Sequence, residues 1–173
     1  PRGWLANLYA RLGFAYMDQQ RMSDARNLFE IGVAIYPKSP DANEGLGECA
    51  YFSKDYPAAV RALSMAVAIN PELISARNRL AQTYAAMGEW RKARDQYRLV
   101  LKSMDWTGQV YIELAKVEMK LGDYAAAART LEQALRRAPY RPDIEEMLAR
   151  IYRDHLRRSE FPAKIHIDTS TEL

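Results

Sequence analysis

Hydrophobic positions along the chain recur with a period of 34 residues, and each period contains two runs of helical spacing. In the fourth period a first run covers 110–121 and is broken by Gly122 and Asp123. A second run covers 124–135 and stops before Pro139, because proline lacks the backbone N–H of a helix and restricts the residue before it. The pattern predicts two helices in each period, joined by a tight turn.

Residues of similar size hold the same positions in successive periods. Small residues at such positions would let a neighbouring helix approach closely. The matching sets are Leu12, Leu46, Leu80 and Leu114; Gly13, Gly47, Ala81 and Ala115; Ala25, Ala59, Ala93 and Ala127; Phe29, Leu63, Tyr97 and Leu131; and Pro37, Pro71 and Pro139. So many matches at a spacing of 34 residues indicate a repeated structural unit.

This arrangement resembles the tetratricopeptide repeat family. The resemblance covers about residues 6–158 and implies an all-α, right-handed solenoid of helix-turn-helix repeats with a C-terminal capping helix. A cap is expected because the last repeat of a solenoid would otherwise leave its apolar face bare. The expected segments are a flank or tag remnant over 1–5, repeats over 6–39, 40–73, 74–107 and 108–141, a capping helix over 142–158 and a tail over 159–173.

Three positions depart from the family pattern. Gln20 and Lys54 stand where the family has a turn glycine, and Asp105 stands where it has a closing proline. Glycine suits such turns because it adopts conformations that other residues avoid. We therefore expect local differences in the turns at these positions, with the fold unchanged.

The two ends of the chain carry separate expectations. The start at Pro1 favours a fragment or a processed form whose upstream portion is missing. The tail alternates polar and apolar residues over 164–169, as a strand does. It is expected either to be flexible or to pack on its own chain or on a neighbouring molecule.

The composition, with 49% hydrophobic and 27% charged residues, is that of one ordinary soluble domain. A net charge of +3 does not by itself indicate nucleic acid or a membrane as partner, and no apolar run approaches the ~20 residues of a membrane span. Cys49 has no disulfide partner, and His155 and His166 leave little for a metal site. Without a catalytic set or a phosphate-binding loop, the sequence predicts a non-enzyme that needs no cofactor or metal.

The resemblance implies that the first helix of each repeat, helix A, lines a concave groove. Large apolar residues on that surface are expected to cluster and to mark a binding site for a protein or peptide segment with apolar anchors. The alternative is that Phe14 and Phe52 pack into the core between repeats. The predicted groove residues are Phe14, Met17, Glu48, Tyr51, Phe52, Asn78, Arg79, Gln82, Ile112, Lys116 and Met119. The same alignment also places Asn7, Asp41, Glu44, Ser75 and Gln109 on this side.

Charge differs between neighbouring repeats, since residues 40–73 are mainly acidic and residues 74–105 mainly basic. Opposite signs would orient a ligand or pair two copies of the chain. Three functions are left open: protein or peptide binding as a scaffold, assembly factor or chaperone; self-association into a structure; and RNA binding by a helical repeat. RNA is disfavoured because the groove of the first two repeats is acidic to neutral.

Some members of the family grip the carboxylate tail of heat-shock chaperones with lysine and asparagine at fixed helix A positions. Here those positions hold Ala10, Phe14 and Gly45, so no such clamp is predicted. A further similarity, on residues 24–29 and on the Tyr51-Phe52 pair, is to the small tetratricopeptide chaperones of bacterial secretion systems. The net positive charge of this chain and its additional repeat differ from what is typical of that group.

Overall fold

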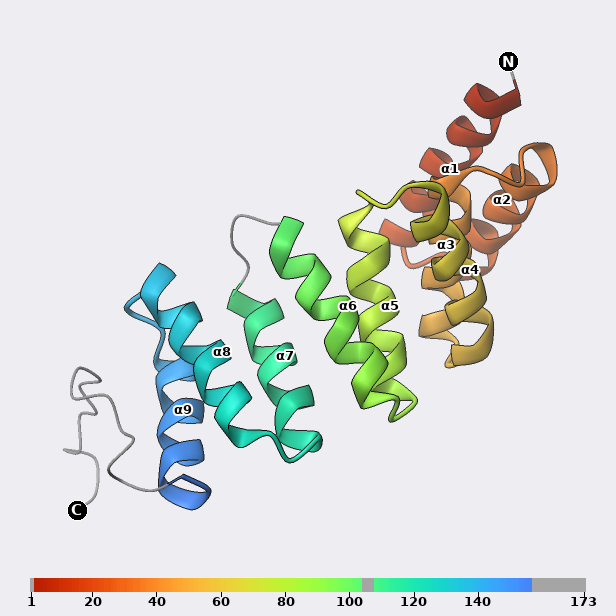
Figure 1. Ribbon diagram of the computed structural model, residues 1–173. Helices are drawn as coiled ribbons and strands as arrows, with labels where there is room; N and C mark the ends of the chain where they lie inside the picture. The colour runs from red at the N-terminus through yellow and green to blue at the C-terminus, as the bar shows by residue number, and fades with distance from the viewer. Residues whose placement is uncertain (1, 104–107, 157–173) are drawn as a thin grey trace. The chain divides into compact units, whose positions relative to one another are not determined.

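The computed structural model describes residues 2–103 and 108–156, and in these ranges every regular element is an α-helix (Figure 1). The chain forms two compact units, unit 1 over Pro1–Ser103 and unit 2 over Met104–Leu173. The predicted all-α helical-repeat fold is confirmed, because the helices come in pairs at the predicted spacing. Asp105 and the predicted tail over 159–173 lie outside the described residues.

Unit 1 consists of three helix pairs packed one after another. They are α1 (Arg2–Asp18) with α2 (Met22–Ile35), α3 (Pro40–Phe52) with α4 (Tyr56–Ile69), and α5 (Ile74–Ala86) with α6 (Trp90–Ser103). The second helix of a pair, helix B, also contacts helix A of the next pair, as α2 contacts α3 and α4 contacts α5. α3 contacts both α1 and α5, so the three A helices of unit 1 lie side by side.

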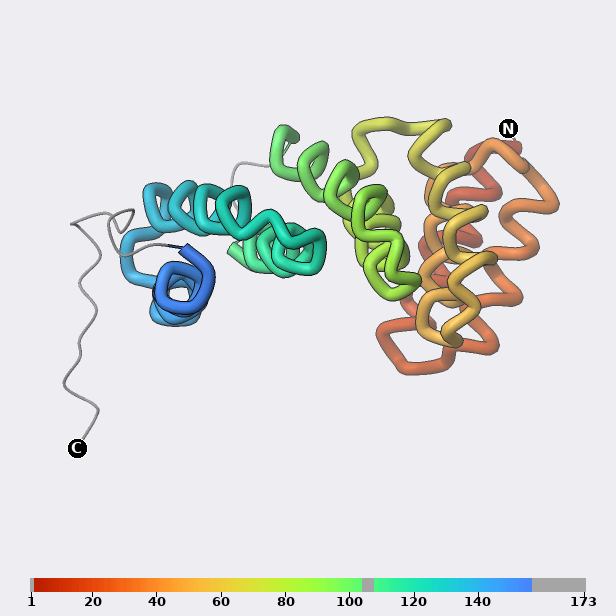
Figure 2. Tube along the Cα trace, turned by 60° about the horizontal axis from the view of Figure 1, so that its bottom comes forward, coloured from red at the N-terminus to blue at the C-terminus, as the bar shows by residue number. Residues whose placement is uncertain are grey.

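Unit 2 contains α7 (Gly108–Lys120), α8 (Tyr124–Arg137) and α9 (Pro142–Asp154). α8 packs against both α7 and α9, and Figure 2 follows the three helices through this unit. α9 occupies the position of the predicted capping helix. Its first turn carries Asp143 and Glu145, whose negative charges suit the positive end of the helix dipole.

The turn inside every helix pair has the same backbone conformation. Gln20, Lys54, Gly88 and Gly122 have φ angles of 62°, 61°, 75° and 77°. Glycine adopts this left-handed conformation at little cost, whereas in other residues it brings Cβ close to a carbonyl oxygen. The expectation that the turns at Gln20 and Lys54 would differ is therefore wrong, because both residues adopt the conformation that glycine adopts in the later repeats.

Backbone hydrogen bonds hold these turns. In the first pair the N–H of Gln20 donates to the carbonyl of Met17 at 2.8 Å, and the N–H of Arg21 donates to the carbonyl of Tyr16 at 2.9 Å. These bonds satisfy carbonyl groups that the end of a helix would otherwise leave unpaired. The hydrogen bonds offset part of the cost of placing a glutamine in the left-handed region.

The predicted ends of the B helices are confirmed at three prolines. The residues before Pro37, Pro71 and Pro139 are extended, with ψ angles of 93°, 94° and 92°. Proline forces this because its ring clashes with a helical conformation of the preceding residue. After Pro37, Ser39 begins the next helix by accepting a hydrogen bond from the N–H of Ala42 at 3.3 Å.

The small residues of the repeat pattern make room for large side chains of the B helices. Phe29 is fully buried, and a Cβ added to Gly13 or to Gly45 would lie 2.6 Å or 2.1 Å from its ring. A Cβ added to Gly47 would lie 2.4 Å from Leu63. The predicted packing reason for glycine at positions 13 and 47 is confirmed, because any side chain there would overlap a core residue.

α1 is longer at its start than the other A helices of unit 1. It begins at Arg2, although residues 1–5 were expected to be a flank outside the fold. α3 begins at Pro40, which corresponds to Ala6 one period earlier. The described residues 2–5 therefore add about one helical turn ahead of the first repeat.

Replacing Gln20 or Lys54 by glycine should raise the free energy of unfolding by about 1 kcal/mol each, because glycine relieves the left-handed strain. Urea denaturation monitored by circular dichroism measures the change. As the opposite control, Gly122→Ala should lower stability by about 1–2 kcal/mol. A loss of stability on adding either glycine would contradict this assignment.

Gly45→Ala should lower the free energy of unfolding by about 1–3 kcal/mol, because the new methyl group overlaps the Phe29 ring. The matched control is Gly3→Ala in α1, where the nearest atom to the added Cβ is 3.8 Å away on Tyr36. That change should leave stability unchanged or raise it slightly, since alanine favours helix. Equal effects of the two substitutions would show that Phe29 is not confined by Gly45.

Candidate functional site

The A helices of unit 1 bring polar and aromatic side chains to one surface, which we call the A-helix face. Most successive members on one helix are three or four residues apart, which is the spacing of neighbours on a helix surface, and Tyr51 and Phe52 are adjacent. The central helix, α3, contributes carboxylates in its first part and an aromatic pair at its end. The A-helix face comprises Asn7, Asp41, Glu44, Glu48, Tyr51, Phe52, Ser75, Arg79 and Gln82, and the predicted groove residue Asn78 is half-buried in α5.

Arg79 of α5 joins the two parts of this face. Its guanidinium carbon lies 4.7 Å from the ring centre of Tyr51 and 5.1 Å from that of Phe52. Its Nε donates to the Glu48 carboxylate at 2.7 Å, and its Nη1 donates to Oε1 of Gln82 at 2.6 Å. The side chain is thus fixed by an ion pair, a hydrogen bond and two cation–π contacts.

The aromatic pair forms a platform with one open side. Tyr51 and Phe52 meet edge to face, with ring centres 5.7 Å apart, and Tyr51 also contacts Tyr56. Tyr51 packs against the core cluster that contains Leu63 and Leu80, whereas Phe52 is 50% exposed. The Phe52 ring is therefore held in place from one side and available to solvent on the other.

Glu44 is a buried carboxyl group at the centre of the face, with an exposed fraction of only 7%. Burial raises its pKa, and the neighbouring negative charges of Glu48 and Asp41 raise it further. The Ser75 hydroxyl, which donates to the carboxylate, and the charge of Arg79 act in the opposite direction. Burial is the largest of these effects, so the charged form of Glu44 is disfavoured in the folded protein.

Polar contacts link the A helices across the face. The Nδ2 of Asn7 in α1 donates to Oδ2 of Asp41 in α3 at 2.5 Å, and the Arg79–Glu48 pair links α5 to α3. Each contact joins one repeat to the next, so the A-helix face is connected across all three helices. Its polar groups are oriented before any ligand arrives.

The expected apolar cluster of Phe14, Met17, Tyr51 and Phe52 is divided between two places. The rings of Phe14 and Phe29 meet edge to face at 5.0 Å, and Phe14 and Met17 both pack against the core cluster around Phe29. Phe52 instead lies with Tyr51 beside Arg79. Packing into the core between repeats therefore describes Phe14, whereas Phe52 has an apolar side chain exposed to solvent, as the groove hypothesis expected.

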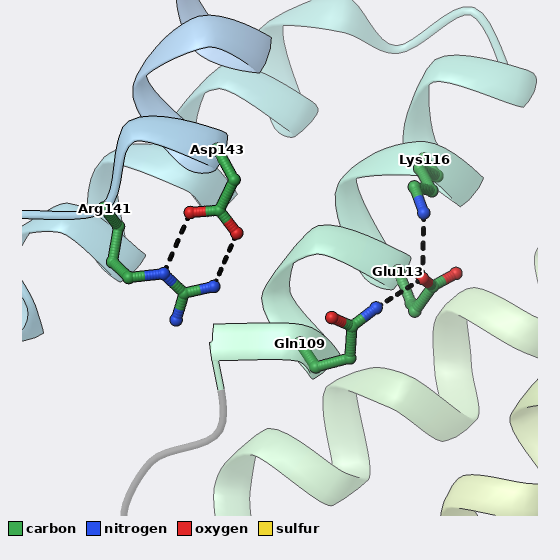
Figure 3. Close-up of polar contacts among 5 residues, drawn as sticks. All are labelled: Gln109, Glu113, Lys116, Arg141 and Asp143. Atoms are coloured by element: carbon green, nitrogen blue, oxygen red, sulfur yellow. Dashed lines mark hydrogen bonds and ion pairs between the residues drawn. The ribbon is translucent and has the colours of Figure 1, made fainter.

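The remaining predicted groove residues lie on α7 of unit 2 and are described separately. Ile112 is buried, and Met119 is half-buried. Lys116 donates to the Glu113 carboxylate at 2.9 Å, and Gln109 donates to the same oxygen at 2.8 Å, as Figure 3 shows. Ile112 therefore offers little side-chain surface to a ligand, whereas Lys116 is exposed.

A second polar contact in unit 2 supports the start of α9. Arg141 donates from Nε and Nη2 to the two carboxylate oxygens of Asp143, at 2.9 Å and 2.6 Å (Figure 3). The hydrogen bonding lowers the pKa of the Asp143 carboxyl. Both side chains are at the surface, so this pair is a local feature of the helix end.

The sequence pattern placed Glu44 on the groove side of its helix but did not mark it as a site residue. The spacing of Asp41, Glu44 and Glu48 along one helix was the available signal. Its hydrogen bond with Ser75 and its interaction with the charge of Arg79 come from the next repeat, which the spacing within α3 does not reveal.

Within the described ranges, the structure contains no group of three or more histidine, cysteine, aspartate or glutamate side chains that could hold a metal ion. In the same ranges, no helix is long and apolar enough to cross a membrane. Cys49 is buried, and burial raises the pKa of its thiol.

Comparison with known proteins agrees with this geometry. Three family models, each described as tetratricopeptide repeat, match residues 4–74, 73–103 and 108–151. A search of curated proteins finds no match.

Solved structures share the fold. A crystal structure of MamA is 25% identical, covers 78% of this chain and 78% of its own, and superimposes with a TM-score of 0.72. PilF of Pseudomonas aeruginosa is 18% identical over 88% of this chain and 69% of its own, with a TM-score of 0.75. The first tetratricopeptide domain of Spaghetti (RPAP3), solved with the HSP90 peptide SRMEEVD, is 21% identical over 69% of this chain and 95% of its own, with a TM-score of 0.66.

The paired helices, the repeated turns and the side-by-side A helices define a helical-repeat protein. The chain belongs to the tetratricopeptide repeat family. Members of this family are generally non-enzymatic protein-interaction modules, and no catalytic family is indicated for this chain.

Glu44→Gln should raise the melting temperature at pH 7, because it removes a buried negative charge. A carboxyl pKa raised by folding means that the folded protein binds the proton more tightly than the unfolded chain. Stability therefore falls as pH rises from the ordinary value of 4.5 through the raised pKa.

The advantage of Glu44→Gln should accordingly shrink as the pH is lowered towards 4.5, where the native carboxyl takes up its proton. Thermal melts of both proteins across this pH range measure the difference. Glu72→Gln, at an exposed glutamate of the α4–α5 loop, should leave the melting temperature unchanged across the same pH range. A destabilising effect of Glu44→Gln at pH 7 would contradict the assignment.

Proposed function

We propose that unit 1 is a scaffold module that binds a segment of another protein on its A-helix face. The observation that carries the proposal is the arrangement of Arg79, Tyr51 and Phe52, in which a fixed cation orders a half-exposed aromatic ring. Such a platform loses little side-chain freedom on binding, so more of the contact energy contributes to affinity. We propose that an apolar side chain of the partner packs on Phe52.

The charges of the face favour one kind of partner. Burial disfavours the charged form of Glu44, so the half-exposed carboxylates of the face are Asp41, at the start of α3, and Glu48, which is paired with Arg79. A segment with lysine or arginine near its apolar anchor would complement them, and an acidic segment would be repelled. The same carboxylates disfavour RNA, because a polyanion needs a basic surface.

The packing also bears on the predicted absence of a carboxylate clamp. At position 45, where the clamp has an asparagine, a Cβ would lie 2.1 Å from the Phe29 ring. Ala10, at another clamp position, is fully buried. The acidic peptide SRMEEVD of the RPAP3 structure is therefore a suitable negative probe for this chain.

Selection of peptides from a random display library with the full chain as bait tests the proposal. The selected peptides should combine an aliphatic or aromatic residue with a nearby lysine or arginine. Phe52→Ala should weaken binding of a selected peptide by about tenfold, the loss typical of a central anchor contact. Fluorescence anisotropy of the labelled peptide measures the affinity.

Met65→Ala is the matched control, because Met65 is also 50% exposed but lies on helix B of the second repeat. It should leave the affinity unchanged, and SRMEEVD should not bind. Equal effects of the two alanine substitutions, or selection of acidic peptides, would contradict the proposal. Circular dichroism should show that both variants remain folded.

A further inference from the structure

Glu44 differs from the other members of the A-helix face because it is buried, with an exposed fraction of 7%, whereas the others are half-buried or exposed. A buried carboxyl group is charged at a cost, since it has lost most of its contact with water. A change in the charge around it therefore shifts the balance between its protonated and ionised forms.

The polar groups that act on Glu44 lie on two helices. Asp41 and Glu48 lie about one turn before and after it on α3, and the negative charge of each raises its pKa. From α5, the Ser75 hydroxyl donates to its carboxylate, and Arg79 supplies a positive charge. Glu44 thus belongs to a compact cluster of ionisable groups that spans two repeats.

The other helices that pack on α3 contact it in different ways. α1 brings the uncharged Asn7, which donates a hydrogen bond to Asp41. α2 and α4 pack through large apolar side chains, Phe29 against Gly45 and Leu63 against Gly47. Among the described residues, the charges that act on Glu44 are therefore those of α3 and α5.

The positive charge in this cluster is already shared. Nε of Arg79 donates to the Glu48 carboxylate at 2.7 Å, so the guanidinium is only partly available to Glu44. When Glu44 is ionised, the carboxylates of Asp41, Glu44 and Glu48 face this single guanidinium. A cation of a bound segment would reduce the excess of negative charge and so favour the ionised form of Glu44.

A bound segment also shields the face from water, which by itself favours a neutral carboxyl group. This effect is small at Glu44, because the side chain is already buried and has little contact with water left to lose. The charge of the segment, by contrast, acts on a buried group, where salt screens it weakly. The charge of the segment therefore outweighs its shielding.

We infer that a cationic segment bound to the A-helix face drives Glu44 to release its proton, so that the affinity of the face depends on pH through this one buried carboxyl group. This coupling rests on the proposed function, because it requires a cationic segment on that face. Without the segment the pKa of Glu44 is raised above 4.5, and with the segment it falls back towards that value. Since the coupling is reciprocal, affinity rises with pH between the two pKa values and is constant above them.

Isothermal titration calorimetry of the full chain with a display-selected peptide measures this coupling. The peptide has an acetylated N-terminus and an amidated C-terminus, and it contains no histidine, aspartate or glutamate. We expect its affinity to rise roughly fivefold or more between pH 4.5 and pH 7, a typical size for coupling between two sites. Titrations in two buffers of different ionisation enthalpy should show that binding releases a proton within this range.

Glu44→Gln keeps the size of the side chain but cannot titrate, so its affinity should not vary with pH and its binding should release no proton. Glu72→Gln, the same change at an exposed glutamate, should keep the pH dependence of the native chain. Asp41→Asn removes a charge that raises the pKa of Glu44, so the rise in affinity should move to lower pH.

A second peptide, in which glutamine replaces each lysine and arginine, separates charge from shielding. It should bind the native chain without proton release. Equal proton release by the two peptides, the same pH dependence in Glu44→Gln, or affinity that is constant or falls as pH rises would overturn the inference.

Phe52→Ala judges the proposed function separately, because it should weaken binding at every pH. A peptide that depends on Phe52 but binds equally at all pH values would contradict the coupling alone. A peptide whose affinity does not depend on Phe52 would contradict both.

Discussion

The architecture of unit 1 depends on how large side chains of the B helices fill space that small residues leave open. Phe29 occupies the volume that side chains at positions 13 and 45 would need, and Leu63 does the same at position 47. Because two glycines from different repeats surround one ring, α1 and α3 lie close together on either side of it. This packing brings the A helices into a row and gathers their outward residues on one face.

The proposed binding surface follows from that row. The A-helix face exists because α3 lies against α1 and α5, which sets Arg79 over the aromatic pair of the preceding repeat and encloses Glu44.

Much of the fold could be predicted because successive repeats carry residues of similar size at the same positions. The closing prolines and the small residues at fixed intervals predicted the helix ends and the close contacts. The sequence could not show that Gln20 and Lys54 would take a glycine-like conformation, since hydrogen bonds and tertiary packing override local preference there. Phe14 and Phe52 were both predicted to line the groove, but Phe14 meets Phe29, whereas Phe52 faces a guanidinium. Nothing in the 34-residue pattern signals the division into two compact units.

The central claim is that packing of the A helices creates a surface that binds a protein segment. Backbone amide NMR of the full chain, titrated with a peptide selected against it, tests this claim most directly. The account predicts that shift changes concentrate on α3 and α5 around Phe52 and Arg79, with small changes on the outward sides of α2, α4 and α6. Changes centred on those B helices, with the A-helix face unaffected, would contradict it.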